Sequence, residues 1–180
     1  GLSYEAMVQA RVLRPLSMTS TGVTLTPEMK ARLATGHGAN LVPVANWDSN
    51  ALAGAGALRS SANDMLTFLA ANLGYVKTPL AAAMAAQLSI RRPAGKGMEI
   101  AYNWFVFTKN GRSIIWHNGG TGGYRSFIGF DPDARAGVVV LTNFLTPAGP
   151  DDIGRHLLNA TLPLAKVDAP KVHEEIAADP

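Results

Sequence analysis

The sequence predicts an α+β fold in which helices pack on an antiparallel β-sheet. The main β signal lies between residues 112 and 143, where three β-like runs are separated by turn-forming residues. These runs are Arg112–His117, Tyr124–Phe130 and Gly137–Thr142. Apolar residues on either side of this region recur instead at helical spacing. With 180 residues, 47% of them hydrophobic, the chain is long enough for one domain with a substantial core.

The composition excludes several functional classes. The net charge is only +3 and the basic residues are scattered, so a nucleic-acid-binding surface is not expected. Cysteine is absent, which excludes disulfides, thiol chemistry and cysteine-bound zinc. His37 has no His, Asp or Glu partner at metal-ligand spacing, so we expect no metal site and no cofactor. No apolar run approaches the ~20 residues that cross a bilayer.

Capped helices are expected in the first part of the chain. Ser3 is a suitable N-cap for a first helix, which Pro15 ends because it disfavours helical geometry at the preceding residue. Thr26 precedes a helical turn with Pro27 at its first position. Ser61 caps a further helix, and Asp64 is expected to complete a capping-box-like pair with it. The apolar face of that helix carries Met65, Leu66, Leu69 and Leu73.

The sheet is expected to be a meander of four strands. After an alanine-rich helix near residues 79–89, Arg91–Met98 is predicted to form a loop and Ile100–Thr108 a strand. Asn110-Gly111 then makes a two-residue hairpin turn into the three runs described above. Val138–Leu141 is apolar at every position, which indicates a strand buried on both faces, in the middle of the sheet.

The chain is expected to end in a helix and a tail. Asp151 and Asp152 place acids at a helix N-terminus. The apolar face that follows contains Ile153, Leu157, Leu158 and Leu162. We divide the chain into one domain over residues 1–162 and an extended or disordered tail over residues 163–180. Within the domain, residues 1–99 are mainly helices and loops, residues 100–143 form the antiparallel strands, and residues 149–162 form the final helix.

Four glycines occur within five residues, from Gly119 to Gly123. One interpretation is a flexible hairpin turn between two strands. The other is that glycine lets a substrate lie close against a strand whose backbone N–H groups face it. The glycines alone leave both interpretations open, and the surrounding motif favours the second.

The motif is His117-Asn118-Gly119-Gly120-Thr121-Gly122-Gly123-Tyr124, followed by a strand, an Asp-Pro pair and Gly137–Asn143. This order resembles the C-terminal part of the penicillin-recognising serine hydrolases. It is most similar to the class C β-lactamase group with its related D,D-peptidases, D-aminopeptidases and family VIII esterases. His117-Asn118-Gly119 would be the His-x-Gly form of that family's Lys-Thr-Gly motif.

Other segments extend the resemblance over nearly the whole chain. Gly1–Glu5 has the form Gly-x-Ser-Tyr-Glu, and Pro15–Thr21 is similar to the family's Pro-Leu-Gly-Met-x-x-Thr, with Ser17 in place of the glycine. Gly56–Asp64 is similar to Gly-Gly-Leu-x-Ser-Thr-x-x-Asp. Tyr102-Asn103-Trp104 matches the family's Tyr-Gly-x-Gly-Trp only in part. The resemblance implies the C-terminal part of the β-lactamase/D,D-peptidase, or transpeptidase-like, fold.

The resemblance also implies roles for four residues. His117 would be catalytic, bordering the pocket and either polarising the proton network or attracting a substrate carboxylate. Asn118, Gly119 and Gly120 would bind substrate. Of these, Asn118 would donate a hydrogen bond, Gly119 would keep the strand open to the ligand, and the Gly120 N–H would be one of two oxyanion-hole donors.

Two motifs that the family's acyl transfer requires are absent from this sequence. Neither Ser-x-x-Lys, which carries the nucleophile, nor Tyr-x-Asn occurs in the 180 residues. In the family both precede the segment that opens this chain, so we expect a fragment of a longer hydrolase that is inactive alone. The alternative is a non-catalytic binding or assembly module that kept the fold. A complete hydrolase using Ser60, Ser61 or Ser126 is disfavoured, because none has the lysine spacing or a Gly-x-Ser-x-Gly elbow.

The resemblance implies partners and a location as well. The parent enzyme would act on a β-lactam, peptide or ester. Without the family's N-terminal elements an edge strand and an apolar patch would be exposed, so we expect self-association or pairing with the missing N-terminal fragment. The chain begins in a helical pattern without a signal peptide, and the family suggests a periplasmic or secreted location.

Overall fold

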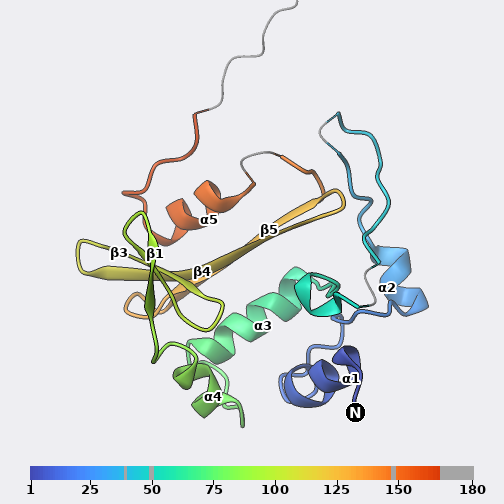
Figure 1. Cartoon of the computed structure of the whole chain (residues 1–180), viewed down its shortest axis with the longest axis horizontal. Helices are drawn as coiled ribbons and strands as arrows, with labels where there is room; N and C mark the ends of the chain where they lie inside the picture. The colour runs from blue at the N-terminus through green and yellow to red at the C-terminus, as the bar shows by residue number, and fades with distance from the viewer. Residues whose placement is uncertain (39, 49–50, 147–148, 167–180) are drawn as a thin grey trace, which may run out of the picture.

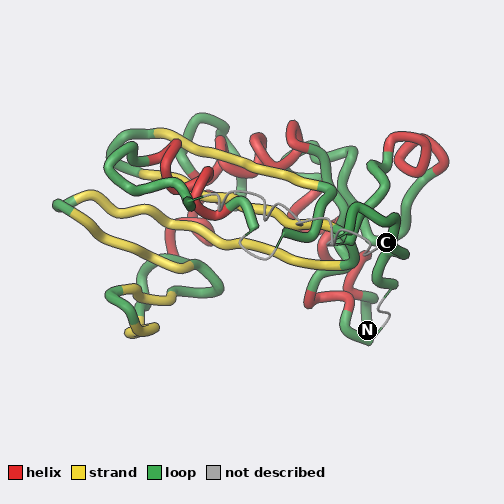
Figure 2. Tube along the Cα trace, turned by 90° about the horizontal axis from the view of Figure 1, so that it is seen from above, coloured by secondary structure: helices red, strands yellow, loops and turns green. Residues whose placement is uncertain are grey.

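One antiparallel sheet of six strands organises the part of the chain that the computed structural model describes, which is residues 1–38, 40–48, 51–146 and 149–166 (Figure 1). The strands lie in chain order: β1 Arg92–Gly95, β2 Met98–Ile100, β3 Phe105–Lys109, β4 Arg112–Thr121, β5 Tyr124–Asp131 and β6 Ala136–Thr142. Figure 2 shows the strands alongside one another, with the short β1–β2 hairpin at one margin. The predicted α+β class is confirmed.

The helices are short and lie on both faces of the sheet. They are α1 Tyr4–Val8, which continues as a π-helical segment over Gln9–Leu13, then α2 Pro27–Arg32, α3 Ala62–Asn72, α4 Ala81–Ala86 and α5 Asp151–Leu158. A 3-10 turn covers Ala53–Ala55. Figure 1 shows α3 against one face of the sheet and α5 against the other.

Alternation along the strands divides the core between these two helices. On the α3 face, Leu69 packs with Ile115 and Phe130. On the α5 face, Leu158 packs with Trp116 and Phe127. Burying a side chain of this size contributes about 1.5–3 kcal/mol. Because both faces are covered, β4 reads as a continuous apolar run where it crosses the core.

The predicted helix caps are confirmed at three positions. Ser3 Oγ accepts from the Ala6 N–H at 3.2 Å, Thr26 Oγ1 from the Met29 N–H at 3.2 Å, and Ser61 Oγ from the Asp64 N–H at 3.2 Å. Asp64 does not complete a capping box. Its carboxylate instead accepts from the Ser20 N–H at 2.8 Å and the Thr21 hydroxyl at 2.6 Å.

The backbone conformation of Ser17 explains why the similar segment of the family carries glycine at this position. Its φ is +56°, in the left-handed region where a side chain costs about 1–2 kcal/mol and glycine costs nothing. The chain therefore keeps the backbone turn after Leu16 although it has lost the residue that forms this turn most easily.

The prediction of four strands was wrong at the start of the sheet. Arg91–Met98, predicted as a loop, contains β1 and the first residue of β2, and the turn between them uses positive φ values at Lys96 (51°) and Gly97 (72°). The single strand predicted over Ile100–Thr108 is two strands, because Asn103 takes a φ of +62° and interrupts the extended backbone. The first two strands are specified by their pairing, β1 with β2 and β2 with β3, and not by an alternating pattern.

The predicted position of Val138–Leu141 in the middle of the sheet was also wrong. These residues lie in β6, the last strand of the described sheet, which pairs with β5. Val139 faces the α3 side and Val138 and Val140 the α5 side, so both faces are apolar as expected. Leu141 is nevertheless 47% exposed. An apolar run indicates that both faces of a strand are covered. It does not indicate that a neighbouring strand lies on each side of it.

The apolar face of α5 differs from the predicted one in two residues. Leu158, together with the more C-terminal Leu162, is buried as predicted, but Ile153 is 45% exposed and Leu157 is 63% exposed. Gly154 faces the sheet, where the Phe127 ring occupies the space that a Cβ would need. The predicted tail at residues 163–180 lies mostly outside the described residues, and 163–166 have no regular structure.

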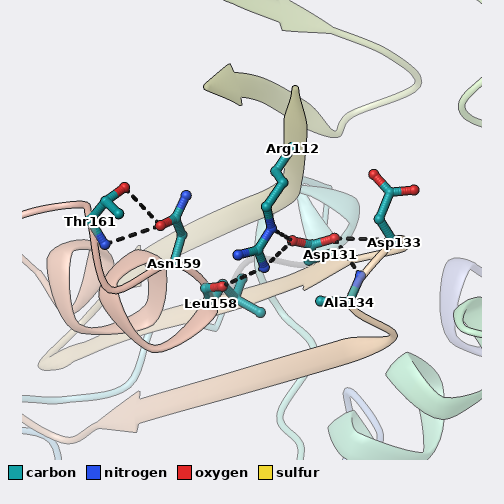
Figure 3. A network of polar contacts seen from close by, with 7 residues as sticks. All are labelled: Arg112, Asp131, Asp133, Ala134, Leu158, Asn159 and Thr161. Carbon is teal, nitrogen blue, oxygen red and sulfur yellow. Dashed lines mark hydrogen bonds and ion pairs between the residues drawn. The ribbon is translucent and has the colours of Figure 1, made fainter. Parts of the chain in front are cut away.

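An ion pair between a buried carboxylate and a partly exposed arginine joins three parts of the sheet and α5 (Figure 3). The Arg112 guanidinium at the start of β4 donates to Asp131 Oδ2 at the end of β5, at 2.6 Å from Nη2 and 3.0 Å from Nε. Arg112 Nη2 also donates to the Leu158 carbonyl at 3.3 Å. Asp131 Oδ1 accepts from the N–H groups of Asp133 (3.0 Å) and Ala134 (2.9 Å) in the β5–β6 turn.

These donors determine the charge state of Asp131, whose side chain is fully buried. Burial by itself would raise the pKa of this carboxyl. The Ala134 N–H, the Arg112 guanidinium and the Asp133 N–H together outweigh burial and hold the pKa below its usual range. Asp131 is therefore an ionised carboxylate at neutral pH.

We expect Asp131→Asn to lower the free energy of unfolding by about 1–3 kcal/mol at neutral pH, because Arg112 loses a charged acceptor. Since the folded pKa lies below the unfolded value of about 3.9, this stabilisation is complete above about pH 4 and is lost as the pH falls through the folded pKa. Urea denaturation at several pH values measures both effects. Asp133→Asn, exposed on the same turn, is the matched control, and an equal loss in the two variants would contradict the assignment.

Candidate active site

The four residues expected at the site lie in one strand. The interpretation that this strand ends before the glycines was wrong, because β4 continues to Thr121 and pairs with β5 up to Thr121 and Tyr124. Strand β3 pairs with β4 only as far as Phe105 and Trp116. Among the described residues, His117–Thr121 therefore pair with a strand on one side only. An extended ligand can add to such an open edge through backbone hydrogen bonds.

The side chains of this edge point to opposite faces of the sheet. By alternation the backbone positions of His117 and Gly119 follow Ile115 on the α3 face, whereas Asn118 and Gly120 lie on the α5 face with Trp116. The His117 ring itself stacks at the open edge on Phe105, a residue of the α5-face cluster. The four predicted residues are thus neighbours in the strand but do not converge through their side chains. What they share is the backbone edge.

His117 is held in one orientation. Its Nδ1 lies 2.6 Å from the Asn118 carbonyl oxygen, and its ring stacks on Phe105 with ring centroids 5.4 Å apart. A carbonyl only accepts hydrogen bonds, so Nδ1 carries the proton and Nε2 is the acceptor nitrogen of the neutral ring. Nε2 is therefore the nitrogen that a reacting group would use as a base.

Asn118 is linked to the first turn of α5. Its Nδ2 donates to Asp151 Oδ2 at 2.6 Å. Burial raises the pKa of the Asp151 carboxyl, while the Asn118 amide and the charges of Arg155 and Arg125 oppose the rise. The sequence placed Asp151 only at a helix N-terminus; its contact with Asn118 joins positions 33 residues apart. No pattern in the sequence shows this contact.

Close packing against backbone atoms explains the later glycines of the cluster. A Cβ on Gly122 would stand 2.5 Å from the Ala45 carbonyl oxygen and 2.9 Å from Trp47 Cδ1, whereas a Cβ on Gly120 would meet only the flexible Arg125 side chain, at 2.6 Å from Nη1. Gly123 has a φ of +81°, as a tight turn requires. The turn interpretation thus applies to Gly122 and Gly123, whereas Gly119 and Gly120 belong to the strand.

A cavity of about 710 Å³ opens between the helices and the α3 face of the sheet. Apolar side chains form most of its wall, among them Val12, Met65, Phe68, Ile128 and Val139. Its polar margin contains Gly119, Gly120 and Arg125. Its volume is in the range of small-molecule sites, and it reaches the open edge of β4.

The serines that were weighed as alternative nucleophiles have no base beside them. Ser60 Oγ is 2.7 Å from Thr21 Oγ1, and Ser61 Oγ caps α3. In the described part of the chain, neither of these serines nor Ser126 hydrogen-bonds to a lysine or histidine. Within the same residues, no three His, Asp or Glu side chains are grouped so that they could hold a metal ion.

Comparison with known proteins gives a consistent family. A family model described as Beta-lactamase matches residues 1–174. The human protein "Putative beta-lactamase-like 1" is 29% identical over 157 residues, covering 84% of this chain and 31% of that protein. The chain thus spans about a third of this relative's length.

Solved structures share the fold. The class C beta lactamase from Rhodobacter sphaeroides matches with a TM-score of 0.74 and 24% identity, covering 82% of this chain and 51% of that one. The Beta-Lactamase/D-Alanine Carboxypeptidase from Pseudomonas syringae matches with a TM-score of 0.72 and 20% identity, covering 81% and 50%. The chain spans about half of each structure. None of the helices in its described residues has the length and hydrophobicity to span a membrane.

We expect Asn118→Ala to raise the pKa of the Asp151 carboxyl further, because the variant removes the main hydrogen bond that stabilises the ionised form. NMR titration of the side-chain carboxyl carbons measures this pKa directly. Asp152 is the internal control, since its pKa is lowered chiefly by the Ala165 N–H and should change little. An unchanged Asp151 titration would show that the Asn118 contact does not persist in solution.

Proposed function

Because the chain belongs to the beta-lactamase family, we propose that it is the C-terminal portion of a serine hydrolase that acts on β-lactams or related amides and esters. One observation supports this most directly: β4 presents His117-Asn118-Gly119-Gly120 along a strand edge that β3 leaves open. The cavity beside that edge has the volume of a small-molecule site.

The chain would contribute binding and electrostatic groups to acyl transfer. The Gly120 N–H is a candidate oxyanion-hole donor, and one such donor contributes about 2.7–4 kcal/mol of transition-state stabilisation. His117 would offer Nε2 to the proton network, since Nδ1 is engaged by the Asn118 carbonyl. The open backbone of β4 would align the substrate beside these groups.

The nucleophile would come from residues outside this sequence. Neither Ser-x-x-Lys nor Tyr-x-Asn occurs among the 180 residues, and the two solved relatives are about twice as long as the region they share with this chain. Without a nucleophile the covalent route is closed, whatever the quality of the oxyanion donor. We therefore propose that the chain is inactive by itself.

The exposed apolar residues support the proposal that this C-terminal portion binds a partner. β6 is the last strand of the described sheet, and its Leu141 is 47% exposed on the α3 side, where it also lines the cavity. On the opposite face of the sheet, α5 exposes Ile153 and Leu157 at 45% and 63%. An unpaired edge strand beside apolar side chains favours pairing with another chain. We propose that this surface is covered either by a second copy or by the N-terminal portion of the same hydrolase.

The second candidate function is a non-catalytic binding or assembly module. The absence of both motifs from the sequence favours it, because a module needs the cavity and the fold but no nucleophile. The reading frame upstream of Gly1 separates the two functions. An in-frame Ser-x-x-Lys supports the hydrolase, and a start codon close to Gly1 supports the module.

We expect a fluorescent penicillin to leave the chain unlabelled, because acylation requires a serine activated by a base. A denaturing gel and the intact mass show whether an adduct forms on the 19.0 kDa chain. An adduct on this chain would require a nucleophile within residues 1–180 and would overturn the proposal.

The positive arm of that experiment uses the longer polypeptide, if an in-frame Ser-x-x-Lys exists. Its serine should be labelled, and His117→Ala should slow labelling by about 100-fold if the imidazole acts in proton transfer. His156→Ala is the matched control, since this histidine lies on α5 outside the His117–Gly120 motif and its Nδ1 lies 2.7 Å from the Leu162 carbonyl oxygen. Equal rates in both variants would remove His117 from the mechanism.

We expect the chain alone to self-associate through the β6 edge, and Leu141→Lys to shift it toward the monomer, because a charged side chain on an edge strand opposes pairing. Light scattering over a range of concentrations gives the mass of the species. Leu164→Lys, at a residue that is 50% exposed outside the sheet, is the control. A wild-type chain that remains monomeric without a bound partner would contradict the proposed surface.

A further inference from the structure

The hairpin turn between β3 and β4 carries an Asn-Gly pair that the proposed function does not use. Asn110 and Gly111 are its two turn residues, because Lys109 and Arg112 on either side of them are paired across the strands. Their φ values are 53° and 77°. Positive φ at both central residues defines a type I′ turn, in which Asn-Gly is a preferred pair. Both residues are exposed to solvent.

The side-chain amide of Asn110 is not held in place. The amides of Asn72 and Asn118 each donate a hydrogen bond, to the Phe68 carbonyl and to Asp151, whereas that of Asn110 bonds no other group in the described part of the chain. The space beside Gly111 is open, since a Cβ built there would meet no atom within 4 Å. Water and the Asn110 amide therefore both have access to the Gly111 backbone nitrogen.

An asparagine amide next to an unhindered backbone nitrogen is a reactive pair. The Gly111 nitrogen, once it has lost its proton, attacks the side-chain carbonyl carbon of Asn110. A new C–N bond forms, the bond to the amide nitrogen breaks, and that nitrogen leaves as ammonia with the proton. Water then opens the cyclic imide. It gives aspartate if it cleaves the new bond and isoaspartate if it cleaves the original backbone bond, and nothing is oxidised or reduced.

The turn allows the imide ring to close without unpairing the strands. Ring closure requires the peptide plane between Asn110 and Gly111 to rotate. A type II′ turn differs from a type I′ turn mainly by this rotation, because φ stays positive at the first central residue and changes sign at the second. Glycine adopts either sign of φ. Both turn types suit a two-residue hairpin, so the pairing of Lys109 with Arg112 is kept.

We propose that Asn110-Gly111 is a modification site at which the folded chain deamidates spontaneously, giving aspartate and isoaspartate at position 110. This inference does not depend on the proposed function. Isoaspartate adds a methylene group to the backbone of the turn, and the longer turn no longer matches the pairing of Lys109 with Arg112. Because Arg112 also holds Asp131, the isoaspartyl form loosens the start of β4.

Two other asparagines of the chain serve as internal controls. Asn118-Gly119 is the second Asn-Gly pair of the sequence, but it lies within β4 and its amide donates to Asp151 at 2.6 Å. Asn103 matches Asn110 in its exposure and its positive φ of 62°, but the bulky Trp104 follows it. Neither control should react in the folded chain.

The test is incubation of the full chain in mildly alkaline buffer, followed by peptide mapping with mass spectrometry. We expect the peptide that contains Asn110 to gain the mass difference between an amide and a carboxylic acid, and to do so faster as the pH rises, because the attacking nitrogen must lose its proton. In urea, Asn118 should react as fast as Asn110, while Asn103 stays slow. Asn110→Gln should abolish the reaction at this position. Enzymatic methylation of isoaspartyl carboxylates measures the isoaspartyl share of the product.

Asn110→Asp separates the effect of charge from the effect of the longer backbone. It carries the new charge without the added methylene, and Asp-Gly also suits a type I′ turn, so its midpoint of urea unfolding should stay close to that of the wild type. The isolated isoaspartyl form should unfold at a lower urea concentration. Equal midpoints for these two forms would overturn the proposed effect on β4.

Two results of the peptide map would overturn the modification site itself. One is an Asn110 that is preserved in the folded chain and reacts only in urea, since the turn would then protect the pair. The other is reaction at Asn103 at the same rate as at Asn110, since exposure and positive φ without glycine would then be sufficient.

Discussion

The pairing of β4 with β5 is the constraint on which the rest of the structure depends. Its seven residue pairs run from Ile115 and Phe130 to Thr121 and Tyr124, and they set which side chains face α3 and which face α5. A shift of one residue in this register would exchange the two core clusters between the faces. The same register places Gly119 opposite Ser126 and Gly120 opposite Arg125, so the candidate site and the core are determined by one interaction.

The two ends of this ladder are secured differently. At one end, the Arg112–Asp131 ion pair joins β4, β5, the β5–β6 turn and the last turn of α5. At the other end, glycines allow backbone and indole groups from residues 45–47 to approach the β4–β5 turn. The first arrangement stabilises the fold, and the second shapes the margin of the cavity. Both depend on contacts between residues far apart in the chain.

Two of the open edges in the described sheet, those of β4 and β6, differ in character. The edge of β4 is short, carries the family motif and adjoins the cavity. β6 exposes Leu141 on the α3 side, at the cavity, whereas the exposed Ile153 and Leu157 of α5 lie on the opposite face of the sheet. A chain that spans about half of its solved relatives would leave such surfaces open, and the first suits a small ligand while the second suits a protein partner. The proposed division between substrate binding here and a nucleophile elsewhere rests on the absence of Ser-x-x-Lys and Tyr-x-Asn from the sequence.

The sequence by itself determined the fold class, the helix caps, the three main strands and the motif at His117–Gly120, because side-chain periodicity, capping residues and turn residues act locally. It also indicated that β6 is covered on both faces. Only the tertiary structure decided the edge position of β6, the β1–β2 hairpin, the exposed side of α5, and the contacts of Asp151 and Trp47 near the site. Periodicity records which face of an element is buried, but not which element buries it. That choice depends on packing between distant segments, and no local pattern carries it.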